Sequence, residues 1–484
     1  MPKEIGYIDK FYQGVGKITG LPSVFLHEIL VWENKEPAAL VIGYSIDFVE
    51  AIFFHPEKVD LGQPVFRSKK PIQILAGPKY LGRIVNGVGK PIDDLGVINE
   101  KKYSPIFKES PGIIDREPVT LPLFTGTKVI DSTLPIGRGQ RELIIGDKKI
   151  GKTTLATRTL INQDRNKENG LPPVYGVYVL IGQKKDKIKE TIKILKNYQV
   201  LDSSVVVATV ADDPLVAQYL APYVGCTIAE YFRDHGQDAL IIYDDLTKHA
   251  KVYREISLLL ERPPGREAYP GDIFYLHSTL LERAAKLSSK KYGGSLTALP
   301  IIETLENDIT SFIPTNLISI TDGQIYLDPN LFAQGILPAV NIGLSVSRVG
   351  SQAQHPLLKE VTKSLKLTIS QYHSLKKLVQ LESDLSKEAK EKFTIGELTL
   401  EALKQNKFMP ISLIEEIIIF YGLSHKLFLS INKENWANFE EKLINYLQNE
   451  KEKEAKEILN QPINQAKKNI EKIIKEFLKK YENI

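Results

Sequence analysis

An eight-residue motif, Gly146-Asp-Lys-Lys-Ile-Gly151-Lys152-Thr153, constrains the fold more than any other part of this sequence. It matches the pattern G-x-x-x-x-G-K-[ST], which lies between a buried strand and the first turn of a helix. The apolar run Leu143-Ile-Ile145 precedes the motif, and a helical pattern of apolar residues follows it. The motif and its flanks therefore predict a strand, a phosphate-binding loop and a helix within an α/β domain.

The loop residues have the chemistry that a nucleotide phosphate and a magnesium ion require. Glycines let backbone N–H groups approach phosphate oxygens, and the helix N-terminus adds positive potential. Lys152 is predicted to reach the β- and γ-phosphates, and the Thr153 hydroxyl to ligate Mg²⁺. An ordinary glycine-containing turn is the structural alternative. The predicted nucleotide-binding residues of the loop are Gly146, Asp147, Lys148, Lys149, Ile150, Gly151, Lys152, Thr153 and Thr154.

A second apolar run provides a carboxylate for the Mg²⁺. The segment Ala239-Leu-Ile-Ile-Tyr243 is typical of a buried strand and is followed by Asp244 and Asp245. Ligands of open α/β sheets bind at the carboxyl ends of the strands. Asp244 is therefore predicted to hold Mg²⁺ through water, and Asp245 is interpreted as structural.

The pattern of apolar residues divides the 484-residue chain into three parts. Residues 1–70 contain short strands, over 24–32 and 38–45, that are typical of a small β-barrel. Residues 71–354 alternate buried strand-like runs with helical patterns, which favours a parallel sheet covered by helices. Residues 355–484 have helical periodicity alone. The other predicted elements are strands at 174–181 and 204–209 and helices at 357–403, 411–421 and 470–481.

Composition excludes several classes of protein. The 63 Lys and Arg residues against 59 Asp and Glu give a net charge of +4, too small to indicate binding to nucleic acid. Cys226 is the single cysteine, which excludes an internal disulfide and a Cys-rich zinc site. No run approaches the roughly 18–20 apolar residues of a membrane-spanning helix, and the first residues lack a signal core. The Lys/Glu-rich segment 450–457 is interpreted as a solvated helix face.

Several segments resemble the α subunits of F-type ATP synthases and F-type-like rotary ATPases. They are Pro135-Ile-Gly-Arg-Gly-Gln-Arg-Glu-Leu-Ile-Ile-Gly-Asp147, residues 215–226 and 230–234, Arg262-Pro-Pro-Gly-Arg-Glu-Ala-Tyr-Pro-Gly-Asp272, residues 274–277, and Ser345-Val-Ser-Arg-Val-Gly-Ser351. The resemblance implies a multi-domain protein with an N-terminal β-barrel, a central α/β RecA-like P-loop nucleotide-binding domain and a C-terminal α-helical domain. It also implies a ring of three α-type and three β-type catalytic chains around a central γ-type shaft.

The resemblance assigns opposite roles to Gln183 and Arg348. ATP hydrolysis needs a carboxylate to activate the attacking water. The β-type chains carry a Glu in a Gly-Glu-Arg sequence after a core strand, whereas this strand ends in Ile181-Gly182-Gln183-Lys184. The amide predicts a protein that binds nucleotide and by itself has little or no activity. Arg348 is expected to act in trans, as an arginine finger at the neighbouring β-type site.

The family's base and phosphate pocket corresponds here to Phe332, Pro338, Gln405 and Lys407. Lys407 stands where the family has Gln, and Leu337 stands where it has Arg. In the loop, Lys149 replaces a Gln and Ile150 replaces a Thr. Because the added and lost cations offset each other, ATP or ADP with Mg²⁺ is still expected to bind.

The remaining expectations concern assembly and location. The protein is expected to be cytoplasmic, on the cytoplasmic face of the membrane, and linked only indirectly to a proton-transporting membrane sector or other machinery. Contact with a δ-type stator is not expected, because residues 5–20 already resemble the first barrel strands. One alternative hypothesis is a mycoplasma-type paralogue in a motor for gliding or surface machinery. Others are a homohexameric translocase, which Gln183 argues against, and a scaffold, which the intact loop argues against.

Overall fold

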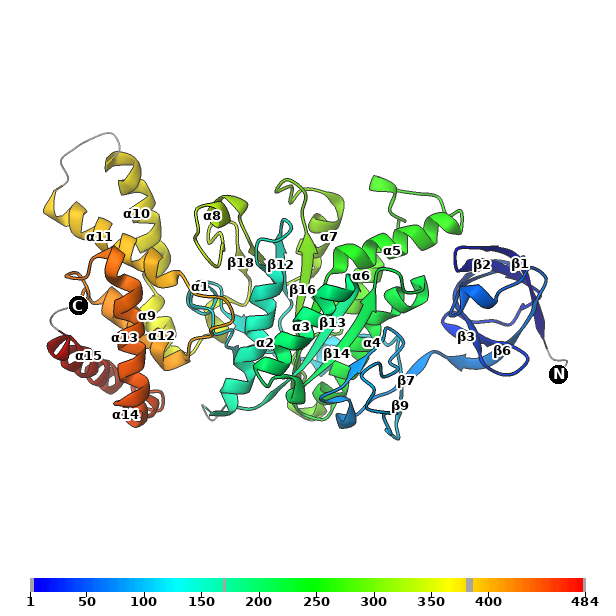
Figure 1. Ribbon diagram of the computed structural model, residues 1–484, viewed down its shortest axis with the longest axis horizontal. Coiled ribbons are helices and arrows are strands. Elements are labelled where there is room, and N and C mark those ends of the chain that lie inside the picture. Colours follow the sequence, from blue (N-terminus) through cyan, green and yellow to red (C-terminus); the bar gives the residue numbers. More distant parts are fainter. Residues whose placement is uncertain (1–3, 169–170, 380–385, 482–484) are drawn as a thin grey trace. The chain divides into compact units, whose positions relative to one another are not determined.

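The described residues of the computed structural model, 4–168, 171–379 and 386–481, belong to two units. The first unit comprises Met1–Pro118, Gly139–Lys148 and Pro173–Asp322, and the second comprises Val119–Arg138, Lys149–Pro172 and Gly323–Ile484. In sequence order the elements form a β-barrel, an α/β domain and a set of helices (Figure 1). The predicted fold class is therefore confirmed.

A closed six-stranded barrel begins the first unit, with the strand order β1-β2-β5-β4-β3-β6. The strands are β1 (Ile5–Tyr12), β2 (Val15–Thr19), β3 (Glu28–Val31), β4 (Pro37–Tyr44), β5 (Val49–Phe53) and β6 (Pro64–Pro71). Ile18, Leu30 and Phe53 are fully buried in its core. The strand predicted over 24–32 is shortened to β3, because Leu26 and His27 form a turn in which His27 has a left-handed φ of 64°.

A parallel sheet forms the core of the first unit, in the strand order β12-β16-β15-β13-β14-β8. Its strands are β8 (Ile84–Val85), β12 (Glu142–Gly146), β13 (Val174–Gln183), β14 (Ser204–Val210), β15 (Asp238–Asp244) and β16 (Ser295–Glu303). A separate antiparallel pair joins β7 (Gln73–Leu75) to β9 (Tyr103–Pro105). Strands β12 to β15 confirm the four predicted apolar runs, which are buried because helices cover both faces.

Five helices follow the central strands of this unit. They are α3 (Lys185–Asn197), α4 (Leu215–Asp234), α5 (Leu246–Leu259), α6 (Ile273–Leu281) and α7 (Phe312–Ile320). Helices α3, α4 and α5 pack on the sheet (Figure 1). Because β13 continues into α3 and β15 into α5, the carboxyl ends of these neighbouring strands open directly onto two helix N-termini. That edge of the sheet carries the candidate site.

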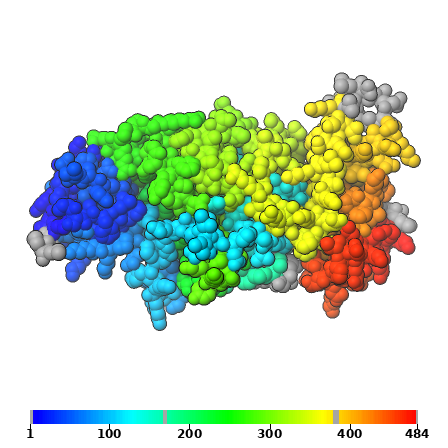
Figure 2. All heavy atoms as spheres, turned by 180° about the vertical axis from the view of Figure 1, so that it is seen from behind, coloured from blue at the N-terminus to red at the C-terminus, as the bar shows by residue number. Residues whose placement is uncertain are grey.

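The barrel contacts the segment that follows α5. The Lys17 ammonium lies 2.8 Å from Glu261, and Arg262 Nε donates to Glu50 at 3.0 Å. Figure 2 shows the blue barrel spheres against the green ones of this segment. Arg262 also donates to the main-chain oxygen of Ile42 at 3.2 Å, so the residues just after α5 are bound to the barrel.

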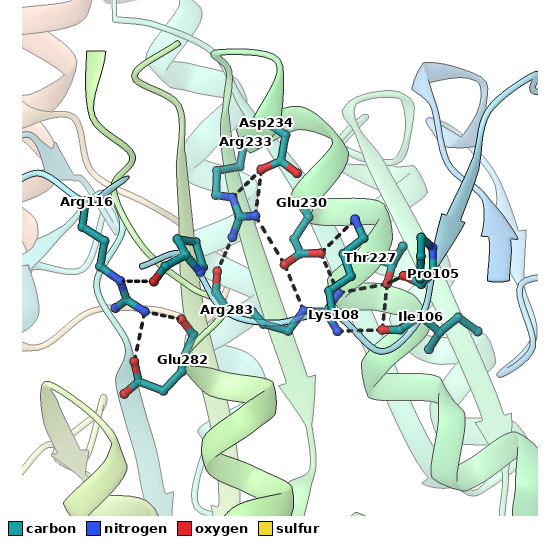
Figure 3. A network of polar contacts seen from close by, with 11 residues as sticks. Pro105, Ile106, Lys108, Arg116, Thr227, Glu230, Arg233, Asp234, Glu282 and Arg283 are labelled. Atoms are coloured by element: carbon teal, nitrogen blue, oxygen red, sulfur yellow. Dashed lines mark hydrogen bonds and ion pairs between the residues drawn. The ribbon is translucent and has the colours of Figure 1, made fainter. Parts of the chain in front are cut away.

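A buried ionic network joins α4 to two loops of the first unit (Figure 3). Arg283 donates to Glu230 from Nε at 2.9 Å and from Nη2 at 2.6 Å. It also donates to the main-chain oxygen of Ile106 at 2.8 Å, and Lys108 lies 3.4 Å from Glu230. One buried glutamate therefore fixes the segment that follows β9 against α4.

The second unit contains the helix of the glycine-rich loop and all the helices of the C-terminal part. Its first elements are β10 (Pro122–Leu123), α1 (Lys128–Thr133), β11 (Ile136–Gly137), α2 (Lys152–Glu168), β17 (Gly323–Tyr326), α8 (Pro329–Ala333) and β18 (Val346–Ser347). The later helices are α9 (Pro356–Thr362), α10 (Leu365–Val379), α11 (Lys387–Leu403), α12 (Leu413–Ser424), α13 (Trp436–Asn449), α14 (Glu452–Ile458) and α15 (Ile463–Lys480).

The C-terminal helices confirm the predicted helical periodicity. Ile470, Ile473, Ile474 and Phe477 of α15 are buried in one stripe, and the Phe477 ring lies 5.5 Å from that of Phe439 in α13. Residues 380–385 of the predicted helical stretch 357–403 lie outside the described residues. None of the helices in the described ranges combines the length and apolar character needed to span a bilayer.

Candidate nucleotide-binding site

The glycine-rich motif connects β12 to α2, as its sequence predicts. Gly151 has a φ of 105°, a conformation that favours glycine, and a Cβ added there would meet nothing within 4 Å. Lys149 also has a left-handed φ, 64°, although it is not glycine. Lys152 begins α2. Lys152 and Ile150 are buried, whereas Lys149 is exposed. The motif therefore lies on a turn between a strand and a helix, and the N-terminus of α2 adds positive potential to this turn.

Asp147 anchors the start of the loop within the first unit. Its Oδ1 accepts a hydrogen bond from the Thr304 hydroxyl at 2.6 Å and from the backbone N–H of Asn307 at 3.1 Å. Lys148 is largely exposed, with its ammonium 3.7 Å from Glu303. The Asp147 carboxylate is thus bound to the segment after β16.

Gln183 and Asp244 lie together at the carboxyl ends of β13 and β15. Gln183 Nε2 donates to Asp244 Oδ1 at 3.0 Å and to its main-chain oxygen at 2.9 Å. The Tyr178 hydroxyl donates to Asp244 Oδ2 at 3.3 Å. Asp244 is only 1% exposed, so its carboxylate is enclosed by these polar partners.

Two lysines that the sequence analysis did not single out also belong to this cluster. The Lys187 ammonium of α3 lies 3.2 Å from Oδ1 and 3.3 Å from Oδ2 of Asp244. The Lys248 ammonium of α5 donates to Gln183 Oε1 at 2.6 Å and to the Gly182 main-chain oxygen at 3.0 Å. Burial lowers the pKa of Lys248. Only their position in the sequence could have indicated that these lysines belong to the site. Both lie in the first turn of a helix that follows a central strand.

Asp245 is the N-cap of α5, consistent with its interpretation as structural. Its Oδ1 accepts from the Lys248 backbone N–H at 2.8 Å. Burial, with the neighbouring Asp244 and Glu303 carboxylates, raises the pKa of Asp245 to about 6. Because burial disfavours its charge and its side chain caps α5, Asp245 is better suited to stabilising the helix than to binding a ligand.

In the second unit, Gln405 lies next to the Leu337–Pro338 peptide, which is cis. Its backbone N–H donates to the Leu337 oxygen at 2.7 Å, and its Nε2 donates to the Gly126 oxygen at 2.7 Å. Lys407 is exposed, as is Phe332 at 40%. The structure thus brings Gln405 and Pro338 together, with Gln405 bound to main-chain atoms.

Arg158 of α2 is a further residue that the sequence analysis did not single out. It donates to the Asn406 main-chain oxygen at 2.7 Å, next to Gln405 and Lys407. Burial lowers the pKa of Arg158 to about 10, although the Asp131 carboxylate acts in the opposite direction. The helix that begins at the loop is therefore bound to the segment that carries Gln405.

Arg348 follows β18 and is exposed. The residues before it are fixed: the Ser345 hydroxyl donates to the Asn341 oxygen at 2.7 Å, and the Ser347 hydroxyl donates to the Pro135 oxygen at 2.9 Å. Within the residues that the structure describes, no hydrogen bond or ion pair engages the Arg348 side chain.

A metal ion at this site would depend on phosphate and water. Among the described residues, no group of three or more His, Cys, Asp or Glu side chains could hold a metal. Mg²⁺ in nucleotide sites binds one or two carboxylates or hydroxyls and keeps waters and phosphate oxygens as its other ligands. Asp244 and Thr153 have the oxygen chemistry that such a site uses.

Comparison with known proteins identifies the family. The model of the ATP synthase alpha/beta family nucleotide-binding domain matches residues 126–347, and that of the C-terminal domain of the ATP synthase alpha/beta subunits matches residues 354–480. The ATP synthase subunit alpha of Rickettsia bellii is 45% identical over 486 residues, which cover 99% of the present sequence and 95% of that protein. The chain belongs to the ATP synthase alpha subunit family.

Other members of the ATP synthase alpha subunit family are equally similar. The subunit alpha of Petrotoga mobilis is 46% identical, with 98% of the present sequence and 94% of that protein covered. The subunit alpha of Carsonella ruddii is 45% identical, with 98% and 97% covered. The similarity thus extends over almost the whole sequence. These comparisons support neither a homohexameric translocase nor a motor for gliding or surface machinery.

Proposed function

We propose that this protein is the nucleotide-binding, non-catalytic α-type subunit of a rotary ATPase head. In this proposal three copies alternate with three β-type catalytic chains around a γ-type shaft. Each copy binds ATP or ADP with Mg²⁺ and supplies Arg348 to the neighbouring catalytic site. Through its partners it lies on the cytoplasmic face of a membrane, where shaft rotation couples ATP hydrolysis or synthesis to proton transport.

The observation that carries the non-catalytic role is the amide of Gln183. A catalytic site needs a carboxylate that accepts a proton from the attacking water, and an amide has no basicity for that step. Both ends of this amide are engaged, because Nε2 donates to Asp244 and Oε1 accepts from Lys248 at 2.6 Å. The side chain is also 3% exposed. Gln183 therefore supports nucleotide binding without efficient turnover.

Nucleotide binding rests on the loop and on the residues that follow the sheet. Lys152 and the loop N–H groups bind phosphate, Thr153 and Asp244 hold Mg²⁺, and Asp244 does so through water. Phe332, Pro338, Gln405 and Lys407 form the base pocket. The Mg²⁺ supplies charge that offsets the phosphates, while the protein residues bind and orient the nucleotide.

The proposal that Arg348 is an arginine finger is supported by its exposed side chain and by the hydrogen bonds that hold the neighbouring Ser345 and Ser347. A guanidinium carries five N–H donors in a rigid plane and stays charged, so it can stabilise the charge on a transferring phosphoryl group. In the proposed ring, the site served by Arg348 belongs to a β-type subunit.

Measuring ATPase activity of the purified protein, alone and mixed with its β-type partner, tests this function. The expected result is bound nucleotide but negligible turnover for the protein alone, and turnover in the mixed complex. Turnover by the protein alone would contradict the non-catalytic role and favour a homohexamer. An empty site together with no effect on the partner's activity would favour a scaffold.

A further inference from the structure

Asp244, the proposed magnesium-holding carboxylate, already has a cationic partner within the protein. The Lys187 ammonium lies within 3.3 Å of both carboxylate oxygens. Asp244 is buried, whereas the Lys187 side chain is 36% exposed. Lys187 therefore reaches a buried carboxylate from the surface, from the first turn of α3.

Neutral side chains also contact the Asp244 carboxylate. Gln183 and Tyr178 donate hydrogen bonds to the carboxylate, but neither carries a charge. Lys248 has its ammonium on Gln183 Oε1 and the Gly182 oxygen, so it acts on Asp244 through Gln183. Lys187, by contrast, brings a full positive charge into direct contact with both oxygens of Asp244.

A cation at this position changes the electrostatics of metal binding. An ammonium and Mg²⁺ that share one carboxylate repel each other, and in a partly buried site this repulsion is only weakly screened by salt. The same ammonium attracts nucleotide phosphates whether or not a metal is present. Lys187 should consequently weaken Mg²⁺ binding and strengthen the binding of metal-free nucleotide.

We propose that Lys187 makes nucleotide binding by this protein largely independent of Mg²⁺, because its ammonium supplies part of the charge compensation at Asp244 that the metal provides. This inference rests on the proposed function, in that it requires nucleotide to bind beside Asp244. Lys187 acts here as a positioning and charge-compensating residue rather than a catalytic one.

The test is the dissociation constant for ATP of the full-length protein, measured by titration calorimetry with Mg²⁺ and with EDTA. The unchanged protein is expected to keep ATP in EDTA. In Lys187→Met, which retains the apolar stem but not the charge, the ratio of the two constants should rise about tenfold. Lys187→Arg keeps the charge and should behave like the unchanged protein.

Lys189→Met is the matched control, because Lys189 is an exposed lysine of the same helix. Its ratio should equal that of the unchanged protein. An equal ratio in Lys187→Met, or loss of ATP from the unchanged protein in EDTA alone, would overturn the inference and leave the proposed function intact. Failure of the unchanged protein to bind ATP in either buffer would overturn both. If Lys187→Met does not fold, the ATP dissociation constant of the unchanged protein in EDTA still tests the inference, because loss of ATP there would overturn it.

Discussion

At the scale of single residues, this protein buries several charges and surrounds them with specific partners. Glu230 is the centre of the network in Figure 3, with Arg283, Arg233 and Lys108 around it. Burial alone would raise the pKa of Glu230, but these three cations hold it at about 2. The carboxylate is therefore ionised wherever the protein is folded near neutral pH, and its stabilising effect is lost on acidification from its ordinary 4.5 towards 2.

Replacing Glu230 with Gln should destabilise the protein by about 3 kcal/mol at pH 7, because the buried Arg283 guanidinium would lose its charged partner. The free energy of unfolding in urea measures this effect. Asp234→Asn is the control: Asp234 also pairs with Arg233, but its side chain is 42% exposed, so the loss should stay below about 1 kcal/mol. Equal losses in the two variants would contradict the role assigned to Glu230.

At the scale of elements, apolar runs predicted most of the central sheet, but the edge strand β8 and the central strand β16 were not predicted. Strand β16 contains Pro300, which has no N–H for a ladder and argues against a central strand. Its place between β12 and β15 comes from the pairing of Ile144 with Ile301 and of Tyr243 with Pro300, which are long-range contacts. The apolar pattern of a single segment cannot predict such long-range pairings.

In the candidate site too, local sequence patterns predict some residues, whereas others are brought in by long-range packing. Gln183 and Asp244 were predictable because each ends an apolar strand, and parallel strands bring their carboxyl ends to one edge. Lys187 was not predictable in the same way. It follows Lys184 and Lys185, and only the packing of α3 determines which of the three ammonium groups reaches Asp244.

Helices α1 and α12 of the second unit contribute two buried carboxyls to one cluster. Asp131 accepts hydrogen bonds from the Thr125 backbone N–H and hydroxyl, each at 2.9 Å, and burial raises its pKa to about 6. Burial and the adjacent Asp131 carboxylate hold the pKa of Glu416 well above its usual 4.5. Within the described residues, neither Glu416 oxygen has a hydrogen-bond partner. The pair is therefore expected to retain a proton that the unfolded state releases.

This proton gives a pH-dependent prediction for Glu416→Gln. Above about pH 4.5 the unfolded state binds fewer protons than the folded one, so the stability contributed by Glu416 falls as pH rises towards its folded pKa. The variant lacks this dependence. Relative to the unchanged protein it should gain about 1.4 kcal/mol per pH unit across that window. Urea unfolding at a series of pH values measures the difference.

The exposed Glu441 of α13 provides the control for this experiment. Glu441→Gln should differ from the unchanged protein by the same amount at every pH. If the Glu416→Gln profile ran parallel to that of the unchanged protein, Glu416 would not retain its proton in the folded state.

At the scale of the whole molecule, the protein has the parts of a nucleotide site but lacks a carboxylate at Gln183, and it carries an exposed arginine that no described residue binds. These two features complement each other if catalysis takes place in a neighbouring subunit. Membership in the ATP synthase alpha subunit family is consistent with such an assembly. The activity of the complex, rather than that of this protein alone, is then the property that Arg348 controls.

Replacing Arg348 with Lys should leave the mixed complex assembled and lower its ATPase turnover by about 10³-fold. Lysine keeps the charge but not the planar set of donors, and its shorter reach moves the ammonium away from the phosphoryl group. Because Arg348 is exposed and its neighbours Ser345 and Ser347 are held by their own hydrogen bonds, the change should not alter thermal unfolding of the isolated protein. Arg266→Lys, at another exposed arginine, should retain turnover. Near-normal turnover of the Arg348→Lys complex would contradict the trans-acting role, whereas loss of assembly would place Arg348 in the subunit interface instead of the neighbouring site.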